Sequence, residues 1–262
     1  MATGDTLSVV VPSWREGPRL LEAVRAARLA TGDAEFVVVA YEESADTRDA
    51  ARAAGVTWIE APRACRGLQL KMGGEAARGD HLLFLHADSR LPFDARRLIR
   101  EALARRGVAG GAFHLRFDHA HPALDLLSWL SGLSLPVTFL GDQCLFCSRE
   151  SYDAAGGFRP EPLFEDVDLA RRLARVGRLL RLRQAVTTSA RRFRDNGPFR
   201  QLAMNALLLG AYCAGADPRR LSAVYPLSRG ARAILPTRRH HRGPGGAARE
   251  LHGTRSREQG EA

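Results

Sequence analysis

Two side chains that can bind a metal close an apolar run in the segment LLFLHADSR, residues 82–90. Asp88 offers a hard oxygen ligand and His86 a nitrogen, a combination that suits a divalent cation such as Mn²⁺ or Mg²⁺. If the run is one strand, both side chains point to the same face, because alternate residues of a strand do so. On this segment alone, Asp88 could equally cap a helix over 89–106, which has Pro92 near its first turn.

Further acidic side chains follow two other apolar runs. Glu16 comes after the run LSVVVP, and Glu42 and Glu43 come after the run FVVV. In an open α/β sheet, ligands bind beyond the carboxyl ends of the strands. We therefore expect these acids to gather with Asp88 at one edge of a sheet.

The spacing of apolar residues predicts the elements that position these side chains. Over roughly the first 110 residues, short apolar runs alternate with segments of helical spacing, which is typical of a doubly wound, parallel α/β sheet. Strands are expected at 7–12, 36–39, 56–60 and 81–87, and helices at 18–30, 46–55, 66–79 and 89–106.

The second half of the chain has longer and more varied segments. Strands are expected at 108–118 and 143–148, and helices at 123–133, 165–177 and 198–214. In the helix over 165–177, Leu169, Leu173 and Val176 share one face and arginines occupy the other. The sequence therefore predicts one α/β domain over 1–228 with a helical C-terminal part.

The net charge of +10 is unevenly distributed along the 262 residues. Residues 229–262 hold eight Arg against three Glu, so half of the excess lies in this tail. The tail is predicted to be disordered, because it has too little apolar surface to offset the entropy of ordering. A solvated terminus is favoured over a site for anionic lipid or nucleic acid, because no aromatic residue interleaves the arginines.

Cysteine content and hydropathy bear on the compartment. Four cysteines are too few and too scattered for a disulfide framework, and CLFC at 144–147 is more typical of a strand than of a zinc site. No apolar stretch reaches the roughly 20 residues that span a bilayer, and the segment 202–214 is expected to pack on the core. We expect a cytoplasmic protein, with peripheral contact at the inner membrane face as an open alternative.

Three segments together resemble the family 2 glycosyltransferases of GT-A fold, from about residue 6 to residue 195. SVVVPSWRE is similar to the family's first strand with its nucleotide-contacting acid. ARGDHLLFLHADS is similar to the segment with the DxD metal motif, and LFEDVDLARRL to the helix start that carries the catalytic base. GDQCLF, TSARRF and HAD in place of DAD are similar to a bacterial subgroup labelled arsenosugar-biosynthesis glycosyltransferases.

The resemblance implies a GT-A fold, with a mostly parallel central sheet flanked by helices, a nucleotide-binding half at about 1–110 and an acceptor half at about 111–228. It implies inverting transfer of a sugar from a nucleotide-sugar donor, UDP-linked, to a hydroxyl of a small-molecule or lipid acceptor, with a divalent cation and no nucleic-acid partner.

The same resemblance assigns roles to particular residues. Asp166 is the catalytic base, with Glu165 as its neighbour and alternative, and Asp88 binds the cation together with His86. Donor contacts are implied at Pro12, Glu16, Glu42, Gln69, Lys71, Ala87, Arg191 and Arg192, and acceptor contacts at Asp142 and Gln143.

One feature departs from the family pattern. Ala40 and Tyr41 stand where the family usually has two carboxylates that help to hold the nucleotide. Glu42, Glu43 or Asp46 would have to replace them, or Glu16 and the sheet edge would hold the nucleotide without them.

Alternatives remain for several of these residues. EDVD at 165–168 is also an ordinary acidic first turn of a helix, and the pair Arg191 and Arg192 is also typical of a solvated surface. Lys71, where the subgroup commonly has Asn, could meet a phosphate or only solvent.

Two other functions compete for the whole chain. A nucleotidyltransferase would carry a Gly-rich, Lys/Arg-containing phosphate loop after its first strand, and only Gly17 is found there. A catalytically silent nucleotide- or membrane-binding protein would explain why Ala40 replaces a carboxylate. It would not explain why the motifs HAD at 86–88 and ED at 165–166 are both kept.

Overall fold

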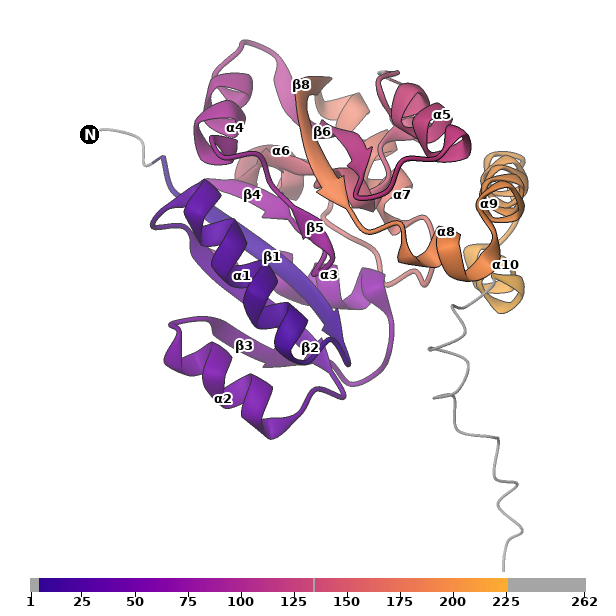
Figure 1. Ribbon diagram of the computed structural model, residues 1–262. Helices are drawn as coiled ribbons and strands as arrows, with labels where there is room; N and C mark the ends of the chain where they lie inside the picture. Colours follow the sequence, from indigo (N-terminus) through magenta and orange to yellow (C-terminus); the bar gives the residue numbers. More distant parts are fainter. Residues whose placement is uncertain (1–4, 134, 226–262) are drawn as a thin grey trace, which may run out of the picture.

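The computed structural model describes residues 5–133 and 135–225, and its centre is one mixed, eight-stranded sheet (Figure 1). The strands are β1 (Leu7–Trp14), β2 (Glu35–Tyr41), β3 (Thr57–Glu60), β4 (His81–Phe84), β5 (Ser89–Arg90), β6 (Val108–Phe117), β7 (Phe146–Ser148) and β8 (Arg178–Thr188). They lie in the order β3-β2-β1-β4-β7-β6-β8-β5. The tail predicted at 229–262 lies outside the described residues.

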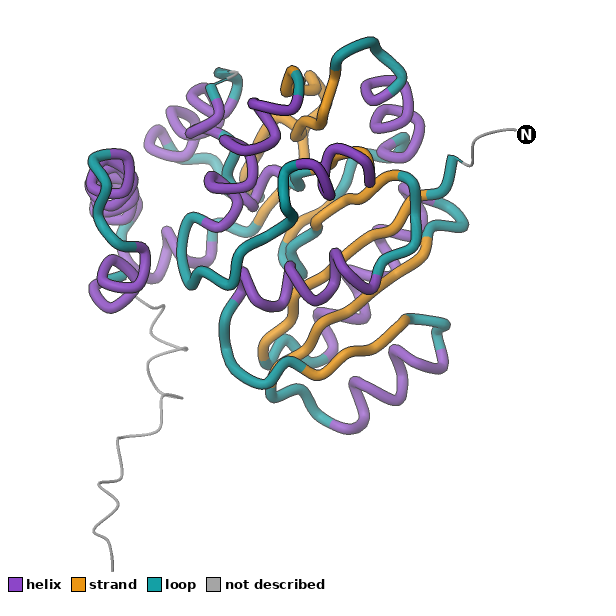
Figure 2. The backbone as a smooth tube through the Cα atoms, turned by 180° about the vertical axis from the view of Figure 1, so that it is seen from behind, coloured by secondary structure: helices purple, strands orange, loops and turns teal. Residues whose placement is uncertain are grey.

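Helices cover both faces of this sheet (Figure 2). They are α1 (Pro18–Thr31), α2 (Ala45–Ala53), α3 (Arg66–Ala76), α4 (Ala95–Leu103), α5 (Pro122–Ser131), α6 (Arg149–Ala154), α7 (Glu165–Val176), α8 (Arg191–Asn196), α9 (Pro198–Cys213) and α10 (Pro218–Val224), with 3₁₀ turns η1 (Pro136–Thr138) and η2 (Gly141–Gln143). Val9 and Val11 pack with α1, α2 and α4, whereas Val10 packs with α3, α6 and α7. Because β1 is covered on both sides, its sequence is apolar throughout rather than alternating.

The parallel half of the sheet is confirmed. Strands β3, β2, β1 and β4 pair in parallel, and their carboxyl ends therefore lie at one edge. Beyond β4 the sheet is mixed, since β7 is antiparallel to both β4 and β6, and β5 is antiparallel to β8. Four of the seven strand pairings are parallel.

Four local expectations were wrong. Strand β4 ends at Phe84 and not at residue 87, and the helix expected over 89–106 is split into the short β5, a loop and α4. The strand β8 was not expected at all. Strands β5 and β8 pair with each other at Ser89 and Thr188, a contact so distant in sequence that local spacing cannot reveal it. In α7 the buried face includes Leu169 and Leu173, but Val176 in the last turn is exposed.

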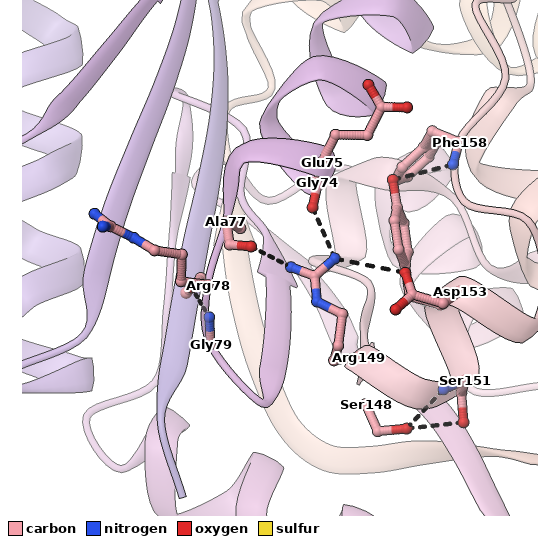
Figure 3. A network of polar contacts seen from close by, with 12 residues as sticks. Gly74, Glu75, Ala77, Arg78, Gly79, Ser148, Arg149, Ser151, Asp153 and Phe158 are labelled. Carbon is pink, nitrogen blue, oxygen red and sulfur yellow. Dashed lines mark hydrogen bonds and ion pairs between the residues drawn. The ribbon is translucent and has the colours of Figure 1, made fainter. Parts of the chain in front are cut away.

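A polar network fastens α6 to α3 (Figure 3). Arg149 Nη1 donates to the carbonyl of Gly74 at 2.9 Å, and its Nη2 donates to that of Ala77 at 2.5 Å. The guanidinium also lies 5.7 Å from the ring centre of Tyr152 and 3.7 Å from Asp153. These contacts fix the C-terminal end of α3, the helix whose first residue belongs to the candidate site described below.

The C-terminal helices pack as a small cluster beside η1 and the start of α7. Leu208 of α9 and Leu221 of α10 are buried against Phe164 and Val167. One face of the segment 202–214 therefore packs on the protein, as expected. Within the described residues, no helix is long and apolar enough to cross a membrane.

Candidate functional site

A cluster of charged side chains lies at the carboxyl ends of the parallel strands. Glu16 follows β1 and Asp88 follows β4, and the two are close enough to interact electrostatically. Arg191, at the start of α8, interacts with Glu16 as well. The gathering predicted at this edge of the sheet is thus found, with α8 as an additional contributor.

Glu43 holds the turn between β1 and α1. Its carboxylate accepts hydrogen bonds from Ser13 Oγ at 2.6 Å and from the backbone amides of Glu16 at 2.7 Å and Gly17 at 3.0 Å. Arg15 and Gly17 both have positive φ values, 53° and 55°, so the turn needs such a fastening. Glu43 therefore shapes the loop that carries Glu16.

Glu42 lies at the rim of this turn. Its carboxylate is 2.8 Å from Arg15 Nη2 and accepts a bond from Trp14 Nε1 at 3.3 Å. Ala40, where the family pattern has a carboxylate, is fully buried in the core. Glu42 and Glu43 were considered as replacements for the missing carboxylates. Glu43 instead accepts hydrogen bonds from the backbone of the loop, and Glu42 pairs with Arg15.

The half-buried Glu16 carries a perturbed carboxyl. Burial raises the pKa of Glu16, Arg191 lowers it, and the nearby Asp88 carboxylate raises it again, with a net increase. Asp88 itself is exposed, and within the described part of the chain its side chain makes no hydrogen bond or ion pair. Two neighbouring carboxylates of this kind attract a cation.

His86 and Asp88 are not arranged as the sequence suggested. The amide of Ser89 donates to the carbonyl of His86 at 3.0 Å, so residues 86–89 form a turn and the shared strand face does not exist. His86 Nδ1 lies 3.3 Å from Asp142 Oδ1. The helix-capping alternative for Asp88 is also wrong, because α4 begins only after Asp94.

The donors around Asp88 fit a cation that is shared with a substrate. In residues 5–133 and 135–225, no three His, Cys, Asp or Glu side chains group as a complete metal site. Mg²⁺ is commonly bound by one or two carboxylates together with substrate phosphates. Asp88, with the Glu16 carboxylate close by, matches that donor set and does not match a resident structural metal.

Glu165 and Asp166 begin α7 and share one arginine. Arg66 forms an ion pair with Glu165, which is completely buried, and its Nη2 lies 3.8 Å from Asp166 Oδ2. Burial alone lowers the pKa of Arg66, but the two carboxylates raise it further than burial lowers it. The arginine is therefore a fixed cation between two acids.

Asp166 is held by backbone groups and has a raised pKa. The amide of Val167 donates to Oδ1 at 2.7 Å, and that of Gly141 donates to Oδ2. Burial and then the neighbouring Glu165 raise the pKa of Asp166, Arg66 and the two amides oppose the shift, and the net pKa is about 6. A carboxyl of this kind titrates close to neutral pH.

Gly141 joins the two halves of the cluster. A β-carbon at this position would lie 2.7 Å from His86 Nε2 and 2.9 Å from Asp166 Oδ2, which are closer than real contacts allow. Only glycine fits without a shift of these side chains. Because His86 and Asp166 flank the same position, the turn after β4 and the start of α7 form one continuous site.

The two predicted acceptor residues on η2 differ in their surroundings. Burial has the largest single effect and raises the pKa of Asp142, but His86, Arg192 and Arg66 together lower it by more, so the net pKa is well below the usual range. Asp142 nevertheless keeps 39% of its side chain exposed. Gln143 is buried, donates to the carbonyl of Thr138 at 2.8 Å and accepts from Arg181.

The other residues predicted to contact the nucleotide-sugar donor include one that supports the sheet and one on the surface. Gln69 is buried and donates to the carbonyls of Ser13 at 2.7 Å and Val39 at 2.9 Å, which ties the ends of β1 and β2 together. Lys71 pairs with Glu75 on the surface of α3.

Three more residues predicted to contact the nucleotide-sugar donor lie on separate elements. Pro12 pairs with Val39 inside the sheet, and Ala87 lies in the turn after β4. Arg192 donates to Tyr225 Oη at 2.9 Å and interacts with Asp142.

Comparison with known proteins gives the family. Residues 4–196 match the family described as glycosyltransferase-like family 2. The chain belongs to this family. A search of curated protein sequences finds no match.

Solved structures share the fold of this family 2 chain. It resembles the mannosyltransferase PcManGT from Pyrobaculum calidifontis in complex with GDP-Man and Mn²⁺, at 20% identity and a TM-score of 0.60, over 84% of this chain and 67% of that one. It also resembles glucosyl-3-phosphoglycerate synthase from Mycobacterium tuberculosis in complex with Mn²⁺, UDP and glucosyl-3-phosphoglycerate, at 20% identity and 0.57, over 82% of each chain. The α/β fold expected for GT-A glycosyltransferases is confirmed.

The roles of three residues that shape the site of this family 2 chain could not be recognised from the sequence. Arg66 is one of many arginines, and only its position at the first residue of α3 marks it. Glu43 was considered for nucleotide contact, whereas it fastens a backbone turn. Gly141 carries no functional group, and its importance is steric.

Proposed function

We propose that this chain transfers a sugar from a nucleoside-diphosphate sugar, UDP-linked, to an acceptor hydroxyl by a single inverting displacement. One observation carries the proposal: His86 and Asp166 flank Gly141, and Arg192 interacts with both Asp142 and Asp88, so these acids lie in one site. A displacement of this kind needs charge compensation at the leaving diphosphate and a base at the acceptor hydroxyl. The site offers both within a short distance.

Asp88, with His86, would hold a divalent cation, Mn²⁺ or Mg²⁺, that offsets charge on the leaving diphosphate. The two structural relatives named above contain Mn²⁺ with GDP-Man or UDP, which supports a cation shared with the donor. Arg191 and Arg192 provide further positive charge, as guanidinium groups pair well with phosphate oxygens. Glu16, held in place by Glu43, completes the donor side.

Asp166 is the base in this proposal, and Glu165 supports it. Glu165 is completely buried and paired with Arg66, so it is out of reach of an acceptor. The raised pKa of Asp166 favours catalysis, because a base accepts a proton best when its pKa lies near the working pH. Asp142, partly exposed beside His86, is placed to orient the acceptor hydroxyl.

The acceptor is proposed only as a class, a hydroxyl on a small molecule or on a lipid. The M. tuberculosis relative is described with phosphoglyceric acid and with glucosyl-3-phosphoglycerate, which supports a small anionic acceptor. The narrower resemblance to the arsenosugar-type subgroup stays a prediction. We propose the cytoplasm as the compartment of the reaction.

Two variants test the division of roles. Asp88→Asn is expected to abolish Mn²⁺-dependent binding of the donor, measured by calorimetry. Asp166→Asn is expected to keep donor binding and to lose release of nucleoside diphosphate in the presence of an acceptor panel. The matched control is Asp49→Asn, which changes an exposed acid of α2 whose one ion-pair partner within the described residues is Arg48.

A silent nucleotide-binding protein is the second candidate, favoured by the core residue Ala40 at a position where the family has a carboxylate. If the chain is such a protein, wild type and Asp166→Asn will bind nucleotide equally well, and neither will release nucleoside diphosphate from a nucleotide sugar. Equal loss of binding in Asp88→Asn and Asp166→Asn, with the fold preserved, would contradict the proposed roles.

A further inference from the structure

The outward face of α9 is almost free of charge. Its exposed residues follow helical spacing on one side: Phe199, Arg200, Ala203, Ala206, Leu207, Gly210 and Cys213. Phe199 and Leu207 expose 65% and 68% of their surface, and Arg200 is the single charged residue of the helix. A helix that faces only water normally carries polar and charged residues on that side.

Helix α5 adds a second exposed apolar stripe. Leu126 and Trp129 share one side of α5, and they expose 46% and 67% of their surface. Rings of His121 and Phe199 meet at 5.3 Å, so the starts of α5 and α9 are adjacent. Both helices lie at the end of the molecule away from β3 and α2 (Figures 1 and 2). We call the exposed residues of α5 and α9 the apolar end face.

Basic residues border the apolar end face. Arg194 on α8, Arg200 on α9 and Arg220 on α10 are exposed, and within the described residues none of them forms an ion pair. The exposed acids here are Asp125 on α5, Asp195 on α8 and Asp217 at the cap of α10, against six arginines on α8, α9 and α10. The face therefore combines apolar side chains with an excess of positive charge.

We propose that the apolar end face docks on an anionic membrane surface. Helices that lie in a bilayer interface combine Trp, Phe and Leu on one side with Lys or Arg beside them, and anionic headgroups attract the basic residues. A second copy of the chain is disfavoured as the occupant, because the basic borders of two copies repel each other. The segment 229–262 is disfavoured for the same reason, since it holds eight Arg against three Glu.

Docking in this way brings the candidate site close to the membrane. Helix α8 runs from Arg191 and Arg192, which interact with Glu16 and Asp142, to the start of α9. An acceptor carried in the membrane would thus meet the site from the side of α8. The docking itself does not depend on the proposed reaction.

Cosedimentation with vesicles tests the proposal, with the full chain and without donor or metal. Wild type is expected to bind vesicles of phosphatidylcholine mixed with phosphatidylglycerol and to bind phosphatidylcholine alone weakly. The double variant Phe199→Ser/Leu207→Ser is expected to lower the partition coefficient by about tenfold or more, because it removes inserted apolar side chains. Arg194→Gln/Arg200→Gln should weaken binding to the mixed vesicles only.

The matched control is Leu29→Ser/Phe93→Ser, which removes two side chains that are 79% and 82% exposed on α1 and before α4. It should bind like wild type. The proposal is overturned if wild type does not bind the mixed vesicles, or if the control pair loses binding as much as Phe199→Ser/Leu207→Ser does. It is also overturned if Phe199→Ser/Leu207→Ser binds the mixed vesicles like wild type, since the charge of the tail would then explain the binding. A solution dimer that these two serines dissociate would also overturn it, and circular dichroism checks that each variant is folded.

Discussion

Replacement of Arg66 by glutamine should cost stability in a way that depends on pH. Arg66 is the cation between two acids at the start of α7, and its partner Glu165 is completely buried. Within the described residues, Glu165 Oε2 has no hydrogen-bond partner at all. Removal of the arginine therefore leaves a buried carboxylate that has lost its counter-charge.

The size of the effect follows from burial. Loss of one partner of a buried ion pair typically costs about 3–5 kcal/mol, because the other charge stays desolvated. Arg66 is 31% exposed, so water reaches the vacated position in part and we expect about 2–3 kcal/mol near pH 8. Glu165→Gln should cost only about 1 kcal/mol, since it leaves no bare charge. The double variant should recover at least about 1 kcal/mol of the Arg66→Gln loss.

The pH dependence has a defined sign. The pKa of Asp166 is raised from 3.8 to about 6 in the folded protein, and Arg66 opposes that shift. Stability linked to a raised carboxyl is full below the unfolded pKa and is lost as pH rises through the folded pKa. Without Arg66 the pKa rises further, so the deficit of the variant should be largest near pH 8 and small near about pH 5.

Urea unfolding followed by tryptophan fluorescence measures these differences. Arg63→Gln is the control, because Arg63 is exposed in the loop before α3 and forms no ion pair within the described residues. A deficit below about 0.5 kcal/mol, or one of equal size at both pH values, would refute the reasoning.

Three further outcomes are expected. Gly141→Ala should lower stability by about 1–3 kcal/mol and abolish turnover, because the new methyl group would displace His86 or Asp166; unchanged urea unfolding and activity would contradict this. Glu43→Gln should weaken donor binding about tenfold in calorimetry, since the turn carrying Glu16 loses charged acceptors for two amides; wild-type affinity would show that the turn holds without them. Turnover at saturating donor should fall tenfold per pH unit below about pH 6, because protonated Asp166 cannot act as the base; a profile that stays flat to about pH 5 would exclude this role.

Local sequence patterns were sufficient for the parallel half of the sheet. Strands such as β1 and β2 are buried on both faces, so their apolar runs stand out, and the helices between them have clear apolar spacing. The acids at the strand ends could be located for the same reason. Elements that depend on distant partners could not be predicted, and β8 and β5, which pair with each other, are the main examples.

The candidate site was only partly predictable. The positions of Glu16, Asp88, Asp142 and Asp166 in one cluster follow from motif order and topology. The pairing of His86 with Asp142 could not be predicted in this way. It depends on the turn at 86–89, which directs His86 to Asp142 and not along the strand. The role of Arg66 depends on a contact between α3 and α7, which no local spacing encodes.

The most direct test of the account is calorimetric titration of UDP and GDP into the wild-type chain, with Mn²⁺ and with EDTA. We predict that one nucleotide binds with Mn²⁺, and that binding is lost in EDTA and in Asp88→Asn. Equal affinity in Mn²⁺ and EDTA, or no binding of either nucleotide to the folded protein, would contradict the central claim that Asp88 binds a donor diphosphate through a metal.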